Sequence, residues 1–99
     1  MIVEFVVAAG KKEQARSWVE VHEAAVVANG EGVPAVPADV TFTATPADAQ
    51  ALHEGVLDLS VGFMRGQVKM AGDFGALLHF LPLTHGDSAP LRIADLLPA

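Results

Sequence analysis

Apolar and polar residues alternate along the first third of the chain with the two-residue period of β-strands. Residues 2–8 are β-branched and aromatic, and they predict a first strand. Residues 16–22 alternate again and predict a second strand, after a polar turn at 10–14. Residues 25–28 form either a short third strand or the continuation of a bent second one. Asn29-Gly30 is a strong turn dipeptide and is expected to end this segment.

The middle of the chain changes from a strand to a helical pattern. Residues 32–38 contain two prolines and predict an extended connector, because proline cannot donate to a strand ladder. Residues 39–45 alternate most clearly and predict a strand. Thr45 with Pro46 then marks the start of a helix to about Glu54, since threonine caps helices and proline suits the first turn. Further elements are expected as a helix over 59–65, capped by Asp58, and a strand over 67–71.

The last predicted long helix is unusually apolar. It covers 74–81, starts after Asp73, is expected to stop at Pro82, and His79 is its polar residue. A helix that is apolar nearly all round is buried on every side, covers a cavity or meets a partner. After a loop, 90–97 predicts a short helix with Leu91, Ala94 and Leu97 on one stripe and Ser88 as a candidate cap.

Together these elements predict an α+β domain. We expect about five strands in a mostly antiparallel sheet, with three to four short helices packed on one face. The domain is expected over 1–83, followed by a C-terminal tail over 84–99.

Composition narrows the possible functions. A formal charge of −6 argues against nucleic-acid binding and against electrostatic docking on anionic membranes. The absence of cysteine excludes disulfides and thiolate chemistry. No apolar run approaches the ~20 residues of a membrane span, so stable membrane insertion is not expected. The start, Met1-Ile2-Val3-Glu4, lacks the basic region of a signal peptide, so a cytoplasmic location is expected.

The chain also contains more apolar residues than a small domain can easily bury. Hydrophobic residues make up 52% of its 99 residues, whereas a domain of this size buries only about 60–65% of its unfolded surface. The surplus points to an obligate dimer or to an apolar ligand.

Residues that could carry chemistry do not form a known motif. His22-Glu23 and His53-Glu54 do not continue to H-E-x-x-H, so no zinc signature is present. Ser60, Asp73 and His79 lack the G-x-S-x-G elbow of serine hydrolases. We therefore expect no catalytic residue, no metal site and no cofactor.

An ordered series of short segments runs through most of the chain. Trp18-Val19-Glu20-Val21 precedes a strand from Asp39, a helix from Pro46 to Gly55 and Val56-Leu57-Asp58. Then follow Gly62-Phe63-Met64-Arg65-Gly66, a lysine-bearing strand, Gly72-Asp73 and the apolar helix. This series resembles the sterol carrier protein type 2 domain family. Several features depart from it: no helix precedes the first strand, the turn at 22–24 lacks the usual glycine, and Leu59 replaces a proline. In addition, the C-terminus is not a peroxisomal tripeptide, and 84–99 has no counterpart.

The resemblance implies a sheet and helices that enclose a hydrophobic tunnel for sterols, fatty acyl chains or related lipids. It also implies that the domain can act as an accessory or dimerising module of enzymes. By this resemblance the pocket-lining residues are expected to be Phe42, Leu52, Leu57, Phe63, Met64, Val68, Met70, Phe74, Leu77, Leu78 and Leu81.

An empty tunnel is energetically difficult for so short a chain. A dry cavity of roughly 300 Å³ costs about 7 kcal/mol, which rivals the whole stability of a small domain. The pocket is therefore occupied, collapsed or completed by a partner.

Three functional hypotheses follow. The first is a noncatalytic binder of apolar small molecules that works as a homodimer. The second is an accessory or dimerisation module with a collapsed pocket, which contacts its partner through helix 74–81, with Leu77 and Leu81 as test positions. The third is a small enzyme that uses His22 or His79 near the pocket mouth.

Overall fold

The computed structural model describes residues 1–86 and 88–98, and it contains a five-stranded sheet in the order β3-β2-β1-β4-β5. β1 and β4 are parallel, and the other three neighbouring pairs are antiparallel. The expected mostly antiparallel sheet is confirmed. Its strands are β1 (Ile2–Ala9), β2 (Lys12–His22), β3 (Ala25–Glu31), β4 (Val40–Ala44) and β5 (Val68–Gly72).

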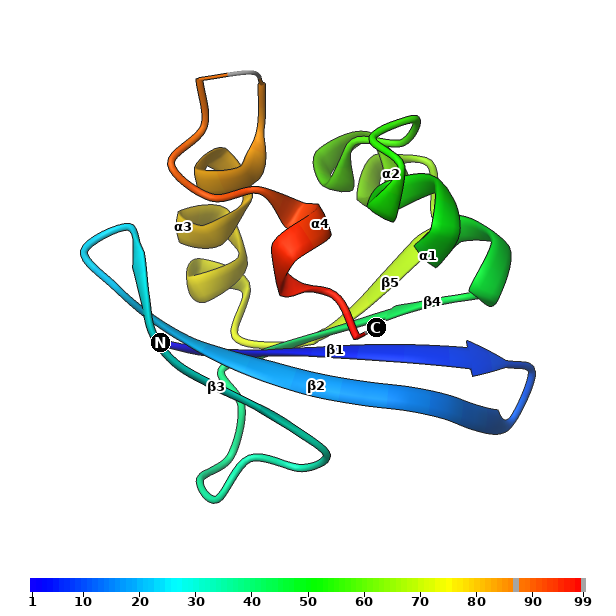
Figure 1. Cartoon of the computed structure of the whole chain (residues 1–99), viewed down its shortest axis with the longest axis horizontal. Helices are drawn as coiled ribbons and strands as arrows, with labels where there is room; N and C mark the ends of the chain where they lie inside the picture. The colour runs from blue at the N-terminus through cyan, green and yellow to red at the C-terminus, as the bar shows by residue number, and fades with distance from the viewer. Residues whose placement is uncertain (87, 99) are drawn as a thin grey trace.

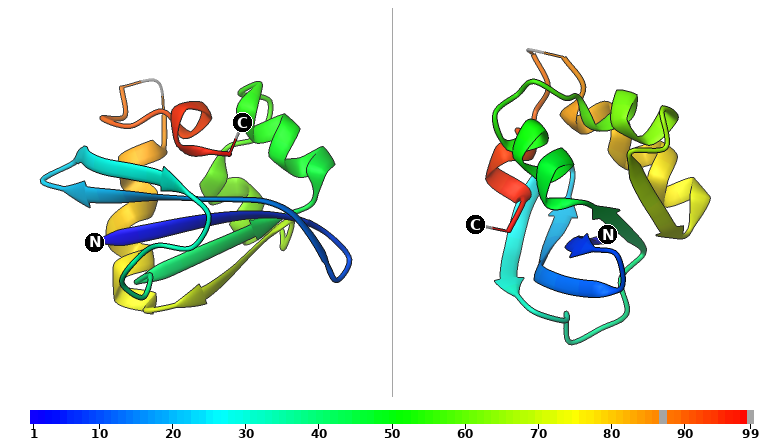
Figure 2. Two further views of the ribbon diagram at one scale, coloured as in Figure 1. Left: turned by 60° about the horizontal axis from the view of Figure 1, so that its bottom comes forward. Right: turned by 90° about the vertical axis from the view of Figure 1, so that its right-hand side faces the viewer.

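Four helices cover one face of this sheet, as Figures 1 and 2 show, and the expected α+β class is confirmed. The first turns of the first three helices follow from local sequence, because the side chains of Thr45, Asp58 and Asp73 accept hydrogen bonds from the free backbone N–H groups. The helices are α1 (Pro46–His53), α2 (Leu59–Met64), α3 (Phe74–Thr84) and α4 (Ile93–Leu96).

The strands β2 and β3 are longer than the sequence predicts. β2 already begins at Lys12, so the polar turn shrinks to Gly10 and Lys11. The turn expected at Asn29-Gly30 is wrong, because both residues lie inside β3. A Cβ atom on Gly30 would lie 2.8 Å from Trp18 Nε1, so glycine is needed here for the indole rather than for a turn.

A tight turn at Glu23-Ala24 separates β2 from β3 and settles that β3 is a strand of its own. Glu23 and Ala24 have positive φ angles of 51° and 62°, a conformation that two-residue hairpins require and that glycine or asparagine usually supplies. The turn was hard to locate from the sequence because neither of those residue types is present.

Two expectations about the C-terminal third are wrong. α3 does not stop at Pro82 but continues to Thr84. Proline removes only the hydrogen bond to the carbonyl of Leu78, which lies on the exposed side of the helix where water can replace it. The last helix, α4, is shorter than 90–97, and its N-cap is Arg92 rather than Ser88.

The connection over residues 32–39 passes on the side of the sheet that faces away from the helices (Figure 1). On this side Glu4 of β1 is buried. Its Oε2 lies 2.7 Å from Arg16 Nη1, and its Oε1 accepts a hydrogen bond from Thr41 Oγ1 at 3.0 Å. Arg16 also donates to Glu13, and this hydrogen bond lowers the pKa of the Glu13 carboxyl and raises that of Arg16. The guanidinium of Arg16 thus pairs with one buried carboxylate, that of Glu4, and one exposed carboxylate, that of Glu13.

Replacing Arg16 with methionine is expected to destabilise the fold by about 2 kcal/mol, because Glu4 is left as a buried charge without its partner. Urea denaturation measures this change. Glu13→Gln is the matched control, since it removes the exposed partner and is expected to leave the midpoint unchanged. Equal effects of the two substitutions would contradict this account of the ion pair.

Candidate functional site

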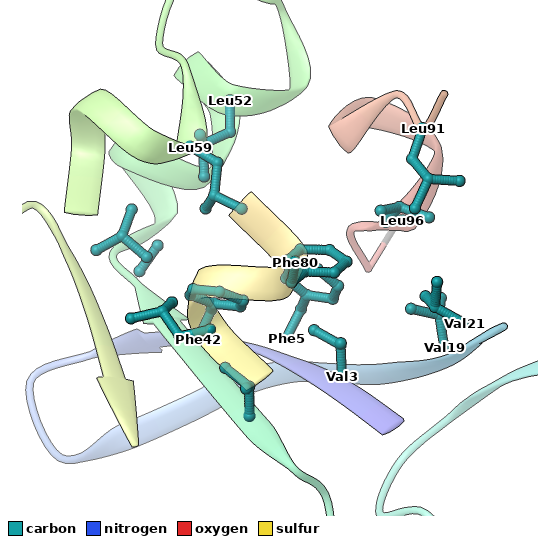
Figure 3. Packing of buried hydrophobic residues seen from close by; sticks show 14 of the residues in the cluster. Val3, Phe5, Val19, Val21, Phe42, Leu52, Leu59, Phe80, Leu91 and Leu96 are labelled. Atoms are coloured by element: carbon teal, nitrogen blue, oxygen red, sulfur yellow. The ribbon is translucent and has the colours of Figure 1, made fainter. Parts of the chain in front are cut away.

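Three phenylalanines occupy the centre of the space between sheet and helices. Phe5 of β1 and Phe42 of β4 are stacked with ring centroids 5.7 Å apart. Phe80 of α3 lies 5.7 Å from the ring of Phe42 and 6.2 Å from that of Phe5, and all three side chains are almost fully buried. Figure 3 shows this aromatic cluster with aliphatic residues around it. Such pairs add about 0.5–1.5 kcal/mol each beyond the burial of their area.

Eight of the eleven residues expected to line a pocket point into or pack against this core. Five of them are buried: Phe42, Leu52, Leu57, Val68 and Leu77. Three are partly buried and pack against the core: Phe63, Met70 and Leu81. These residues come from β4, β5 and the first three helices, except Leu57, which lies in the loop between α1 and α2.

The other three expected pocket residues lie on the surface. Met64 is 83% exposed, and Phe74 and Leu78 are each 58% exposed. Phe74 and Leu78 are one turn apart on α3, whose buried residues include Leu77 and Phe80. The helix is apolar all round in sequence, so its composition does not reveal which side faces the core.

An internal cavity of about 10 Å³ lies beside the aromatic cluster. A single water molecule needs roughly 10–15 Å³, so this cavity is effectively closed. Its lining is entirely apolar and comprises Phe5, Val6, Val7, Phe42, Ala44, Ala49, Leu52, Leu59, Val68 and Leu97. Side chains of the described residues thus fill this space between sheet and helices.

The C-terminal segment also packs on the core and helps to close the internal cavity. The sequence pattern predicted only some of the residues through which it does so. Leu91 and Leu96 are buried and belong to the same core cluster as the phenylalanines. In Figure 3 they lie over Val19 and Val21 of β2. Leu91 and Leu97 were expected on the apolar stripe of this segment, whereas Leu96 was not recognised.

Two open grooves flank the C-terminal segment. The larger, the β3 groove, has a volume of about 720 Å³ and lies between β2, β3 and residues 90–98. Its walls combine apolar residues such as Val19, Val26 and Leu96 with charged ones such as Arg92. The smaller, the α1 groove, has a volume of about 370 Å³ and lies between α1, the β1–β2 end of the sheet, Leu97 and Pro98. Both grooves reach the segment that closes the internal cavity.

The two histidines considered for catalysis line a third groove of about 570 Å³, between α3 and the β2–β3 turn. His22 and His79 share it with Met1, Glu23 and the apolar Leu83. His22 Nε2 lies 3.9 Å from Glu23 Oε1, and both of these side chains are largely exposed. Within residues 1–86 and 88–98, no cluster of three or more potential metal-ligating side chains exists.

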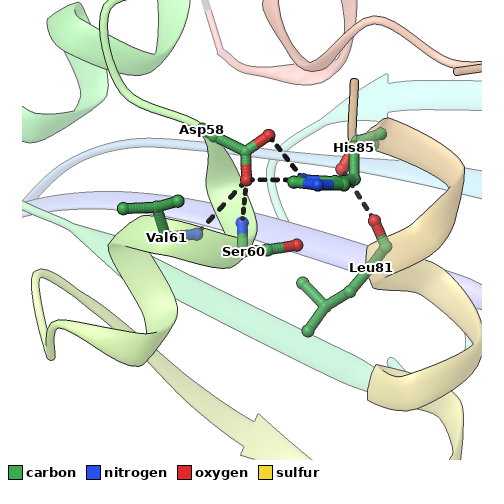
Figure 4. Close-up of polar contacts among 6 residues, drawn as sticks. Asp58, Ser60, Val61, Leu81 and His85 are labelled. Carbon is green, nitrogen blue, oxygen red and sulfur yellow. Dashed lines mark hydrogen bonds and ion pairs between the residues drawn. The ribbon is translucent and has the colours of Figure 1, made fainter. Parts of the chain in front are cut away.

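A histidine–carboxylate contact lies where α3 passes into the C-terminal segment. His85 Nδ1 lies 3.1 and 3.2 Å from the two oxygens of Asp58, which also caps α2 through the N–H groups of Ser60 and Val61 (Figure 4). The contact joins the end of α3 to the start of α2. It therefore fixes the point from which the C-terminal segment departs.

The chain was compared with known families. The model of the SCP-2 sterol transfer family matches residues 2–84. This chain belongs to that family. The resemblance inferred from the ordered motifs is therefore confirmed, and the matched region covers the sheet and α1 to α3 but not α4.

Solved structures show the same SCP-2 fold. A Thermus thermophilus protein, described as a possible sterol carrier protein, is 16% identical with a TM-score of 0.70, covering 99% of this chain and 71% of that one. Sterol Carrier Protein-2 from Aedes aegypti, in complex with palmitate, is 17% identical with a TM-score of 0.59, covering 96% and 74%. The sec-alkylsulfatase Pisa1 from Pseudomonas sp. is 23% identical with a TM-score of 0.58, covering 100% of this chain but 15% of the enzyme.

The chain spans between 56% and 74% of the length of the sterol carrier structures to which it is similar. The search of curated protein sequences finds no match. In the part of the chain that the structure describes, no helix has the length and apolar character needed to cross a membrane.

Phe80→Ala is expected to destabilise this SCP-2 domain by about 3–5 kcal/mol, because it opens the aromatic cluster and leaves a cavity. Chemical denaturation with a circular-dichroism readout measures the loss. Leu78→Ala on the exposed side of the same helix should change stability by about 0.5 kcal/mol or less. A similar loss in both variants would show that α3 does not pack as described.

Proposed function

We propose that this SCP-2 domain binds an apolar small molecule of the lipid, sterol or fatty acyl class between its sheet and its helices, without catalysing a reaction. The observation that carries this proposal is the all-apolar lining of the internal cavity inside a fold of the SCP-2 sterol transfer family. The Aedes aegypti protein with bound palmitate, which has the same fold, supports it.

The closed cavity sets the energetic condition for binding. About 10 Å³ cannot hold a lipid, so a ligand must displace side chains or a segment as it enters. Each methylene group that a ligand buries contributes about 0.8 kcal/mol, so an acyl chain can offset the loss of several side-chain contacts. The pocket residues that pack in the core, such as Leu52 and Val68, would then contact the ligand.

An accessory module with a permanently collapsed pocket is the second candidate. The closed cavity favours it, as does a similar domain that makes up a small share of the Pseudomonas alkylsulfatase. Leu77 is fully buried, so it is unsuitable as a test position for a partner surface, whereas Phe74 and Leu78 on α3 are exposed. A homodimeric assembly and a cytoplasmic location stay predictions.

Ala49→Phe is expected to weaken binding of cis-parinaric acid, a naturally fluorescent fatty acid, by roughly tenfold. Ala49 of α1 lines both the internal cavity and the α1 groove, so a phenyl ring there takes space that the ligand needs. Fluorescence titration measures the affinity. Ala47→Phe is the matched control, since Ala47 is exposed on the same helix.

No probe binding by the unsubstituted protein, at concentrations where it is folded, would refute lipid binding and favour the accessory module. Equal binding by the two alanine variants would place the ligand away from the space beside α1.

A further inference from the structure

Leu97 lies where three spaces meet. It lines the β3 groove, the internal cavity and the α1 groove, and it is the only described residue that lines all three. The two grooves measure about 720 and 370 Å³, and the cavity between them about 10 Å³. Movement of this one residue would therefore begin to connect the two grooves through the core.

The segment around Leu97 is held by few polar contacts. The N–H of Leu91 donates to the carbonyl of Leu83 at 2.9 Å, and Ser17 Oγ donates to the carbonyl of Leu96 at a long 3.4 Å. α4 has four residues, and no side chain caps it. Burial of its leucines is thus the main contribution that keeps residues 90–98 on the sheet.

We propose that residues 90–98 are a displaceable plug, and that a long single-chain lipid enters by replacing Leu91, Leu96 and Leu97. This inference rests on the proposed function and adds how access to the site is controlled. Displacement joins the two grooves and the internal cavity into one channel from β3 to α1, and the lining of its central part is apolar. The ligand then occupies the surface that the leucines cover in the closed state.

The plug sets a minimum length for the ligand. Burying one leucine side chain is equivalent to burying about two to four methylene groups, so three leucines correspond to roughly six to twelve. An acyl chain that buries fewer methylene groups cannot replace the contacts it breaks. Hexanoate falls below this range and palmitate exceeds it, so the site is selective for long chains.

Stopped-flow mixing with cis-parinaric acid tests the plug in the full chain. Leu97→Ala is expected to raise the association rate about tenfold, because truncating a partly buried leucine weakens the closed state. Leu78→Ala, the same change at an exposed position outside the three spaces, is expected to leave the rate unchanged. In competition, palmitate should displace the probe from the unsubstituted protein, and hexanoate should not.

Hydrogen exchange of the unsubstituted protein gives a second test that needs no variant. Palmitate is expected to speed exchange at the Leu91 amide, because displacement breaks its bond to the Leu83 carbonyl. Slower exchange there, or equal association rates for Leu97→Ala and Leu78→Ala, would overturn the plug while probe binding still supports the proposed function. Absence of binding by both the unsubstituted protein and Leu97→Ala would instead refute the proposed function.

Discussion

The aromatic cluster of Phe5, Phe42 and Phe80 is the contact on which the rest of the domain depends. It joins the two central strands to the long helix, and each ring is almost fully buried. Because β1 and β4 are the parallel pair, the cluster also ties together chain segments that no short turn connects. The same three rings fill the space between sheet and helices in which we propose that the ligand binds, so under that proposal stability and binding compete for one volume.

This competition gives the C-terminal segment its importance. The sheet and the first three helices leave apolar surface on β2 that they do not cover themselves, and Leu91 and Leu96 cover it. Part of the apolar surplus is thus buried within one chain, whereas Met64, Phe74 and Leu78 stay exposed.

Local signals were sufficient to predict most elements, because strands with one buried face alternate and the first three helices carry capping residues. Tertiary contacts decided the rest. Gly30 leaves room for the indole ring of Trp18 and does not form a turn. Pro82 is tolerated because the carbonyl that loses its hydrogen bond lies on the exposed side of α3. Among the expected pocket residues, Phe42 of an alternating strand is buried in the core. Phe74 and Leu78 are exposed, and the sequence did not indicate this because a helix that is apolar on all sides shows no preferred face.

The parallel pairing of β1 with β4 also has a consequence for the folding order. β1, β2 and β3 form a local meander, but the other edge of β1 can pair only with β4. The backbone N–H of Ile2 donates to the carboxylate of Asp39, which is 37 residues away in the chain. Non-local pairing of this kind is slow to form. Until it does, the most apolar strand of the protein presents an open edge to other unfinished chains, so dilution and prompt synthesis of the following segment protect it from aggregation.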